Sequence, residues 1–471
     1  MSERTGQIVR GVYRLRFSPN LVDFGTFEVT LNAEGKFQID TSGSATIEDF
    51  EEIAGPDLLD AADDTLDSDY YGRLTGRYTL PDGCKVVVTR SVVRLFIRNS
   101  CTQSWRGLVR DNALYWRAGE KVLSDAVSMH IRFAPPGSKS SPSIVLTSGG
   151  REVSAQRSDV YRRESVTFSA SDGSTFAGTV YIPEDGNALH PAMVMIHGSG
   201  PQDRDGYASI MAVMADELAA SGRVVLTYDK RGVGGSAGDW SRAGFDVLGG
   251  DAGTGIAFLA TLPQVDPSRI GFDGSSQAGW VAAAAIAGGV TAHDVFLLGA
   301  AGTALTVEEQ NLYNTEVLMR CAGIGADDIA LALSQQRAFF AFLADPSKAT
   351  ALDDLTRAAA TRPALADWLF PDSSSTDRSA GAWYVVLDPR FDPLPVWRGY
   401  NGRALFVFNA YDDSTPTTKA IGRLKGMSVE SRLLEDSQHL GLRAADVCHA
   451  EPGDADSFAP DFFKALDDFA R

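Results

Sequence analysis

Short apolar runs alternate with helix-like segments through the middle of the chain, and this alternation constrains the fold more than any other feature of the sequence. Between residues 191 and 300, the strand-like runs AMVMI, VVLTY, RIGFDG and DVFLL are separated by segments of helical periodicity. Runs as apolar as these are typical of strands buried on both faces of a parallel sheet. A hairpin-like segment at 165–183 precedes them. We therefore predict an α/β fold with a mostly parallel central sheet and helices on both faces.

Two regions of different character flank or interrupt this pattern. Residues 1–158 lack a long helical period and hold strand-like runs separated by turn signals, so we predict a β-rich accessory domain there and the α/β domain at 159–471. The alternation stops near residue 303, where Thr306 and Glu309 have the spacing of a helix-capping box. Helical patterns continue beyond them. We predict a helical lid insert at about 303–400.

The charge and hydropathy of the chain exclude two classes of partner. Its 471 residues include 61 Asp and Glu against 43 Lys and Arg, a net charge of -18. Because nucleic-acid affinity comes mainly from clustered Lys and Arg, no nucleic-acid partner is expected. No apolar run approaches the roughly 18 residues of a membrane span, and the N-terminus has no signal-like apolar core, so no membrane partner is expected either.

The cysteines are scattered and contain no C-x-x-C motif, so the sequence indicates no metal site. They are Cys84, Cys101, Cys321 and Cys448. Cys84 and Cys101 lie across a predicted hairpin, which permits a disulfide, but we expect reduced cysteines and a cytoplasmic protein. We expect no cofactor.

The segment GFDGSSQAGW places two adjacent serines between a strand-like run and an alanine-rich helix. A nucleophilic serine at the edge of an α/β sheet occupies a tight strand-to-helix turn, which needs small residues two positions before and after it. Ser276 has Gly274 and Ala278 at these positions, whereas the neighbours of Ser275 are an aspartate and a glutamine. We therefore predict Ser276 as a nucleophile; the alternative is an ordinary turn between a strand and a helix.

A serine nucleophile needs a histidine base and an acid that orients it, in this architecture in the chain order Ser, Asp or Glu, His. Only His439 and His449 lie beyond the helical insert. His439 follows the last strand-like run in the loop SQHLG and is the favoured base. Asp412 ends the preceding strand-like run and is the favoured acid, with Asp413 as the alternative.

Acyl transfer also requires two backbone N–H groups that stabilise the developing oxyanion. One is expected from Gln277, directly after the nucleophile. The other is expected from the glycine-rich loop HGSGPQDRDG, at Ser199 or Gly198, and the sequence does not choose between these two residues. The charged residues at 203–205 are expected to pair and hold this loop; the alternative is that they bind a charged substrate.

Together these motifs resemble those of serine hydrolases in the α/β-hydrolase superfamily. The resemblance rests on HGSGPQDRDG, TYDKRGVGGS, GFDGSSQAGW, NAYDDSTP and SQHLG. Residues from about 160 to 471 are similar to bacterial esterases that share features with the prolyl oligopeptidase-like branch, whose members commonly carry a β-rich N-terminal module. The resemblance implies the same roles for Ser276, Asp412 and His439, and an oxyanion hole formed by Gln277 and the glycine-rich loop.

The chain departs from the pattern of these relatives at three positions. Ser275 stands where relatives often have histidine, and Ala278 and Asn409 stand where glycine is usual. None of these departures removes a predicted catalytic group, but all of them affect the local turn geometry.

We predict hydrolysis of a carboxylic ester or similar acyl compound through an acyl-enzyme on Ser276, with a small-molecule acyl substrate as the partner. The alternatives are a serine peptidase, an acyltransferase and a non-catalytic binding protein on a hydrolase scaffold. The sequence leaves open whether the protein is a homo-oligomer.

Overall fold

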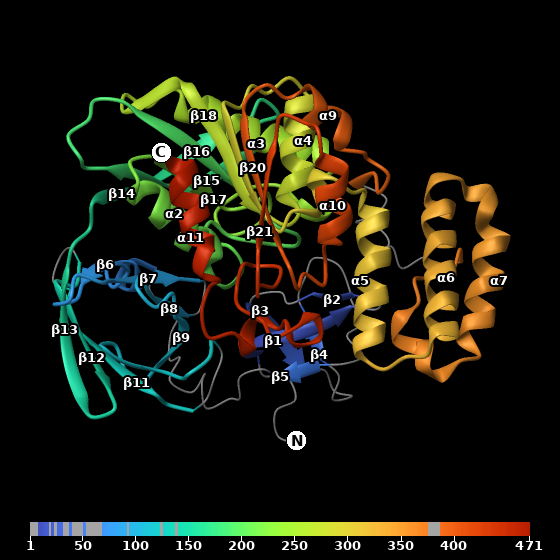
Figure 1. The fold of residues 1–471 in the computed structure, drawn as a ribbon, viewed down its shortest axis with the longest axis horizontal. Coiled ribbons are helices and arrows are strands. Elements are labelled where there is room, and N and C mark those ends of the chain that lie inside the picture. Colours follow the sequence, from blue (N-terminus) through green and yellow to red (C-terminus); the bar gives the residue numbers. More distant parts are fainter. Residues whose placement is uncertain are drawn as a thin grey trace.

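The computed structural model describes residues 68–91, 94–122, 126–136, 140–374 and 387–471, together with the backbone of short strands among the first 52 residues. An eight-stranded sheet forms the centre of the C-terminal part, in the order β14-β15-β17-β16-β18-β19-β20-β21 (Figure 1). Pairing is antiparallel from β14 to β17 and parallel across the rest of the sheet. The strands are β14 (Tyr161–Ser169), β15 (Thr175–Pro183), β16 (His190–Ile196), β17 (Val224–Tyr228), β18 (Val265–Ser275), β19 (Asp294–Leu298), β20 (Arg403–Asn409) and β21 (Glu430–Leu434).

Helices cover both faces of this sheet and form two cores with it. The strands β17 and β19 are buried along their whole length, as strands covered on both sides must be. One face carries α3 (Phe245–Leu259), α4 (Ala278–Ala287), α9 (Leu394–Gly399) and α10 (Thr417–Leu424). The other face carries α2 (Ile210–Ala220) and α11 (Pro460–Ala470). The α/β architecture predicted from the alternating pattern is confirmed.

A helical insert separates β19 from β20. Its longer helices are α5 (Val307–Cys321), α6 (Ala326–Ala344) and α7 (Ala349–Ala360). Thr306 and Glu309 form the predicted capping box, because each side chain accepts a hydrogen bond of 3.2 Å from the backbone amide of the other residue. Figure 1 shows α6 and α7 beyond α5, away from the sheet. Short 3-10 helices complete the domain at Tyr207–Ser209, Trp240–Arg242, Ala301–Thr303, Pro346–Lys348, Pro363–Trp368, Val447–His449 and Pro452–Asp454.

A closed antiparallel β-barrel precedes the sheet in the chain, after the short helix α1 (Ser68–Gly72). Its strands are β6 (Gly76–Thr79), β7 (Lys85–Arg90), β8 (Leu95–Asn99), β9 (Trp105–Arg110), β10 (Tyr115–Ala118), β11 (Met129–Phe133), β12 (Ser143–Ser148) and β13 (Arg151–Arg157). Buried side chains such as Tyr78, Trp116 and Phe133 fill its interior. The barrel ends at Arg157, and β14 begins at Tyr161.

The first 52 residues contribute a small antiparallel sheet. Its strands are β1 (Ile8–Phe17), β2 (Asn20–Val22), β3 (Thr26–Leu31), β4 (Phe37–Ile39) and β5 (Phe50–Glu52). This agrees with the strand-like character predicted for the N-terminal region.

The barrel docks on the α/β domain through buried charges on α2. Arg77 donates hydrogen bonds of 2.9 and 2.8 Å to the carboxylate of Asp216, and the hydroxyl of Tyr161 donates one of 2.5 Å to the same group. Arg98 pairs with the neighbouring Glu217. Removal of one partner would leave an uncompensated charge buried between the barrel and the domain.

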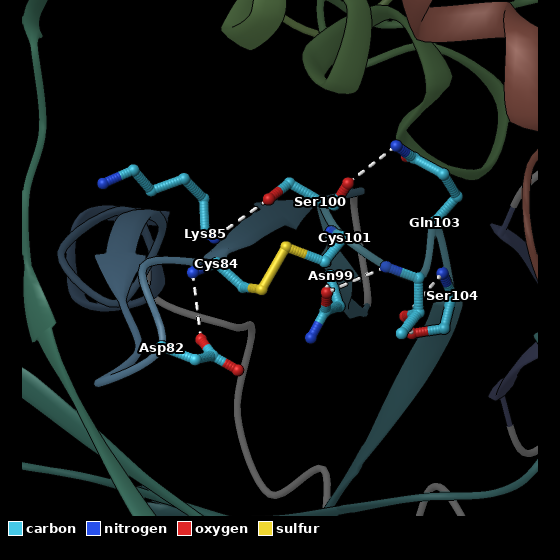
Figure 2. Close-up of a disulfide and its surroundings, with 9 residues drawn as sticks. Asp82, Cys84, Lys85, Asn99, Ser100, Cys101, Gln103 and Ser104 are labelled. Carbon is cyan, nitrogen blue, oxygen red and sulfur yellow. Dashed lines mark hydrogen bonds between the residues drawn. A yellow bond between two sulfur atoms is a disulfide. The ribbon is translucent and has the colours of Figure 1, made fainter.

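A disulfide between Cys84 and Cys101 joins two turns of the barrel. Figure 2 shows it between the residue before β7 and the turn after β8. The Cα–Cα distance of the disulfide is 5.6 Å. The carboxylate of Asp82 accepts a hydrogen bond of 3.0 Å from the Cys84 amide, and the side chain of Asn99 accepts one of 2.9 Å from the Cys101 amide. The hairpin geometry that permits this bond was visible in the sequence, but our prediction of reduced cysteines is wrong.

A second disulfide, between Cys321 and Cys448, links residues 127 positions apart. It ties the last residue of α5 to the segment that follows β21. This pair is not visible in the sequence, because only the fold brings the two segments together. Disulfides persist mainly in oxidising compartments, so the cytoplasmic prediction loses the support that reduced thiols would have provided.

Among the described residues, no helix combines the length and apolar character that crossing a membrane requires.

Candidate active site

Ser276 occupies the turn between β18 and α4. The strand ends at Ser275, the helix begins at Ala278, and the backbone of Ser276 has a φ of 56°. This left-handed conformation is strained for a residue other than glycine, and it is the conformation that a nucleophile on a sharp strand-to-helix turn adopts. The Ser276 amide donates a hydrogen bond of 3.0 Å to the carbonyl of Leu298 on β19. Ser275, in contrast, is still part of the strand.

The residues around this turn have no space for larger side chains. A Cβ added to Gly274 would lie 2.5 Å from the carbonyl oxygen of Ile196 and 2.6 Å from the Cβ of Ala278. A Cβ added to Gly279 would lie 2.7 Å from the carbonyl carbon of Gly302. The small-neighbour argument applied to the sequence therefore has a direct steric basis.

Asp412 and His439 form a hydrogen-bonded pair at the ends of β20 and β21. His439 Nδ1 lies 2.9 and 3.0 Å from the two carboxylate oxygens of Asp412. The carboxylate is buried and also accepts hydrogen bonds of 2.9 and 2.8 Å from the amides of Ser414 and Thr415. Burial lowers the pKa of His439, but the charge of Asp412 and its hydrogen bond outweigh burial and raise that pKa above its ordinary value.

The alternative residues lie in different surroundings. Asp413 accepts a hydrogen bond of 3.0 Å from the hydroxyl of Ser414, and burial together with the charge of Asp412 raises its pKa. The exposed side chain of His449 pairs with Asp446 at 3.0 Å, on the surface. The geometry therefore favours Asp412 over Asp413 as the orienting acid, and His439 over His449 as the base.

Asn409 supports the loop that carries His439. Its side-chain amide donates a hydrogen bond of 3.2 Å to the His439 carbonyl, and its side-chain oxygen accepts one of 3.0 Å from the hydroxyl of Ser437. Gly299 approaches from β19 so closely that an added Cβ would lie 2.3 Å from the His439 carbonyl oxygen. The asparagine that departs from the usual glycine thus has a structural role here, which the sequence alone did not indicate.

These contacts bring Ser276, Asp412 and His439 to one edge of the sheet. Ser276 is bonded to Leu298, and the next residue, Gly299, packs against His439. Among the described residues, however, no hydrogen bond joins the Ser276 hydroxyl to His439. Catalytic hydrogen bonds of this kind are often long without substrate and tighten in the complex.

The glycine-rich loop after β16 lies beside the same serine. A Cβ added to Gly198 would lie 3.6 Å from the Cβ of Ser276. The side chain of Gln202 donates a hydrogen bond of 2.8 Å to the Ser199 carbonyl and so shapes the loop. In the part of the chain that the structure describes, the amides of Gly198, Ser199 and Gln277 donate no backbone hydrogen bond outside the regular helices and strands. They are therefore available to an oxyanion.

The charged residues at the end of this loop are engaged by protein groups. Arg204 donates hydrogen bonds of 2.9 and 2.7 Å to the two carboxylate oxygens of Asp229, after β17. Asp205 pairs at 3.4 Å with Arg90 on barrel strand β7. Burial and the neighbouring carboxylates raise the pKa of Asp203 to about 7. These groups anchor the loop to its surroundings, the barrel included, which is the role we preferred for them.

The insert contacts the site through α5. The hydroxyl of Tyr313 donates a hydrogen bond of 3.0 Å to the backbone carbonyl of Asp412, and the side chain of Asn314 donates one of 3.1 Å to that of Asp413. Burial raises the pKa of Tyr313 to about 12, so it remains a neutral donor.

Within the described ranges, no three His, Cys, Asp or Glu side chains gather in the manner of a metal site.

Comparison with known families and proteins gives two sequence matches. Residues 172–384 match the X-Pro dipeptidyl-peptidase (S15) family. A curated relative, polyketide transferase claH of Penicillium crustosum, is 35% identical over 119 residues, which are 24% of this chain and 36% of the relative. The chain thus aligns with little more than a third of that relative. The family match includes Ser276 but ends before Asp412 and His439.

Similar solved structures include proteins from three sources. The α/β hydrolase GrgF of Penicillium sp. sh18 has a TM-score of 0.38 and 18% identity, covering 59% of this chain and 91% of its own. Est1E of Butyrivibrio proteoclasticus, solved with ferulic acid, has a TM-score of 0.42 and 13% identity, covering 64% and 97%. Acetyl xylan esterase 1 of Thermoanaerobacterium sp. JW/SL YS485 has a TM-score of 0.35 and 15% identity, covering 60% and 80%. All three likenesses are weak, so the roles of the site residues rest on the geometry of this chain.

Proposed function

Because the C-terminal domain is an α/β hydrolase of the serine-hydrolase type, we propose that the chain cleaves a carboxylic ester or related acyl compound through an acyl-enzyme on Ser276. The observation that carries this proposal is the strained backbone of Ser276, with a φ of 56° between β18 and α4. A plain turn at this position would not need a non-glycine residue in that conformation. The paired Asp412 and His439 at the same sheet edge supply the remaining groups of a triad.

In the proposed reaction, the Ser276 oxygen attacks the carbonyl carbon of the substrate while His439 Nε2 takes its proton. Asp412 holds the Nδ1–H and stabilises the imidazolium that forms. The negative charge on the carbonyl oxygen is stabilised by the amide of Gln277 and an amide of the Gly198–Ser199 loop. His439 then returns the proton to the leaving alcohol, and an acyl-enzyme remains.

Deacylation repeats these steps with water as the nucleophile. His439 accepts a proton from the water as it attacks the acyl carbonyl, and then returns a proton to the Ser276 oxygen as the bond to the acyl group breaks. The products are a carboxylic acid and the free enzyme. Since α5 touches the backbone of residues 412 and 413, we assign the insert the role of a lid that forms part of the substrate pocket.

The match to a dipeptidyl-peptidase family favours peptide cleavage as the second candidate function. A panel of p-nitrophenyl esters of increasing acyl length and of X-Pro p-nitroanilides separates the two. We expect ester turnover to exceed anilide turnover, and we expect Ser276→Ala to abolish both. Turnover of the X-Pro anilides alone would contradict the ester assignment and support the peptidase. Ester turnover that survives in Ser276→Ala would contradict the proposed nucleophile.

A further inference from the structure

Lys230 lies buried behind the proposed oxyanion hole. It follows Asp229 after β17, in the loop DKRGVGGS, and only 3% of it is exposed. Its ammonium donates hydrogen bonds of 2.9 Å to the Gly198 carbonyl, 3.0 Å to the Gly200 carbonyl and 2.8 Å to the side-chain oxygen of Gln277. An ammonium has three protons, and three oxygen atoms accept them here.

These three acceptors belong to the two segments that must meet around an oxyanion. Gly198 and Gly200 lie on either side of Ser199 in the loop after β16, and Gln277 directly follows the proposed nucleophile after β18. One buried side chain therefore connects the segments that supply both proposed oxyanion donors.

The geometry of the peptide bond links Lys230 to a particular donor. In a planar trans peptide, the carbonyl of one residue and the N–H of the next point in opposite directions. The Gly198 carbonyl points at Lys230, so the Ser199 N–H of the same peptide unit points away from Lys230. A hydrogen bond from a cation also polarises that peptide unit and strengthens its N–H as a donor. This argument favours Ser199 over Gly198 as the second oxyanion donor. The sequence could not choose between these two residues.

We propose that Lys230 is a positioning residue of the oxyanion hole, which aims the Ser199 N–H and fixes the segment of Gln277 relative to it. The inference rests on the proposed serine-hydrolase function. Lys230 touches neither the substrate nor the reacting atoms; it acts through the two segments that it connects.

The charges around Lys230 define how it titrates. Burial lowers its pKa to about 7, opposed by the carboxylate of Asp251 on α3, which is itself paired with Arg231. His197 also faces it, but burial and the charge of Lys230 lower the pKa of this histidine to about 3, so it stays neutral at working pH. As the pH rises through 7, Lys230 loses a proton, and a neutral amine has only two protons for three oxygens.

Kinetic measurements on Lys230→Met and Lys230→Gln test the inference. Methionine retains most of the stem without donors, and glutamine retains one donor group without the charge. Lys464→Met is the matched control, because Lys464 is an exposed residue on α11 that pairs with Asp468 on the same helix. With a p-nitrophenyl ester, we expect kcat to fall about 100-fold in Lys230→Met, the cost of one lost oxyanion donor, and less in Lys230→Gln. We expect KM to change little and the control to match the wild type.

The pH profile separates positioning from a merely structural role. Activity should rise with pH as His439 deprotonates, with the same midpoint in every folded variant. In the wild type, kcat should then fall as Lys230 deprotonates, and this descending limb should be absent from both Lys230 variants. Asp203 has a pKa in the same range and is present in the wild type and in both variants. The titration of Lys230 is therefore read from the difference between the wild-type and variant pH profiles.

Each outcome supports or overturns the inference. A folded Lys230→Met with wild-type kcat, or with a raised KM and unchanged kcat, overturns it and leaves the proposed function intact. A wild type that hydrolyses no ester and reacts with no fluorophosphonate overturns both. If Lys230→Met does not fold, Lys230→Gln decides, and a folded Lys230→Gln with wild-type kcat overturns the inference.

Discussion

The nucleophile side and the base side of the candidate site are held by different kinds of contact. Around Ser276, a strained turn and small residues at positions 274, 278 and 279 let Ile196 and Gly302 approach closely. Around His439, the supports come from far along the chain: Asn409 on β20, Gly299 after β19, and a disulfide from α5 to Cys448. The sequence pattern that marks the nucleophile side is therefore local, whereas no local pattern marks the supports of the base side.

The segment after His439 is further held by the barrel. The amides of Trp105 and Val122 donate hydrogen bonds of 3.2 and 2.8 Å to the carbonyls of Asp456 and Ala455, and the Trp105 ring packs against Phe458 at 5.2 Å. The barrel thus helps to hold the segment that follows His439. The difference between the nucleophile side and the base side of the site can be tested by changing the supports of each side separately.

The largest effect is expected from the acid that orients His439. Asp412→Asn should lower kcat about 10⁴-fold, because the amide cannot stabilise the imidazolium or hold the right tautomer. The pKa of His439 should fall in this variant, since Asp412 is the main group that raises it. The ascending limb of the remaining activity should therefore move to lower pH.

Asp413→Asn is the matched control for this change, one residue away. It should lower kcat far less, because Asp413 is bonded to Ser414 and not to His439. Steady-state kinetics of both variants over a range of pH make the comparison. A larger loss in Asp413→Asn than in Asp412→Asn would exchange the two roles.

A smaller effect is expected from removal of the two disulfides, and the two removals should differ in their effect on kcat. Replacing either pair with serines should cost about 2–4 kcal/mol of unfolding free energy. Loss of Cys321–Cys448 should also reduce kcat, because α5 and the segment after His439 are no longer tied together. Loss of Cys84–Cys101, within the barrel, should leave kcat close to that of the wild type.

Thermal or denaturant unfolding and ester kinetics on the two double variants test this prediction. Equal losses of kcat in both variants would mean that the disulfides act only through overall stability. An unchanged kcat after removal of Cys321–Cys448 would show that the base loop does not need the insert.

The same difference explains how much the sequence could predict. The alternating pattern, the capping box at Thr306 and the turn at Ser276 depend on residues within a few positions of one another, so periodicity and small neighbours were sufficient. The pairing of Cys321 with Cys448, the role of Asn409 and the contacts of Lys230 depend on segments that only the folded sheet brings together. No local pattern carries that information.

Covalent labelling with a fluorophosphonate, followed by intact-mass analysis, tests the central claim that Ser276 is an activated nucleophile. The wild type, Ser276→Ala and Ser275→Ala would be treated side by side and checked for folding. We expect one adduct on the wild type and on Ser275→Ala, and none on Ser276→Ala. A folded wild type without an adduct, or an adduct that persists in Ser276→Ala and disappears in Ser275→Ala, would contradict the account.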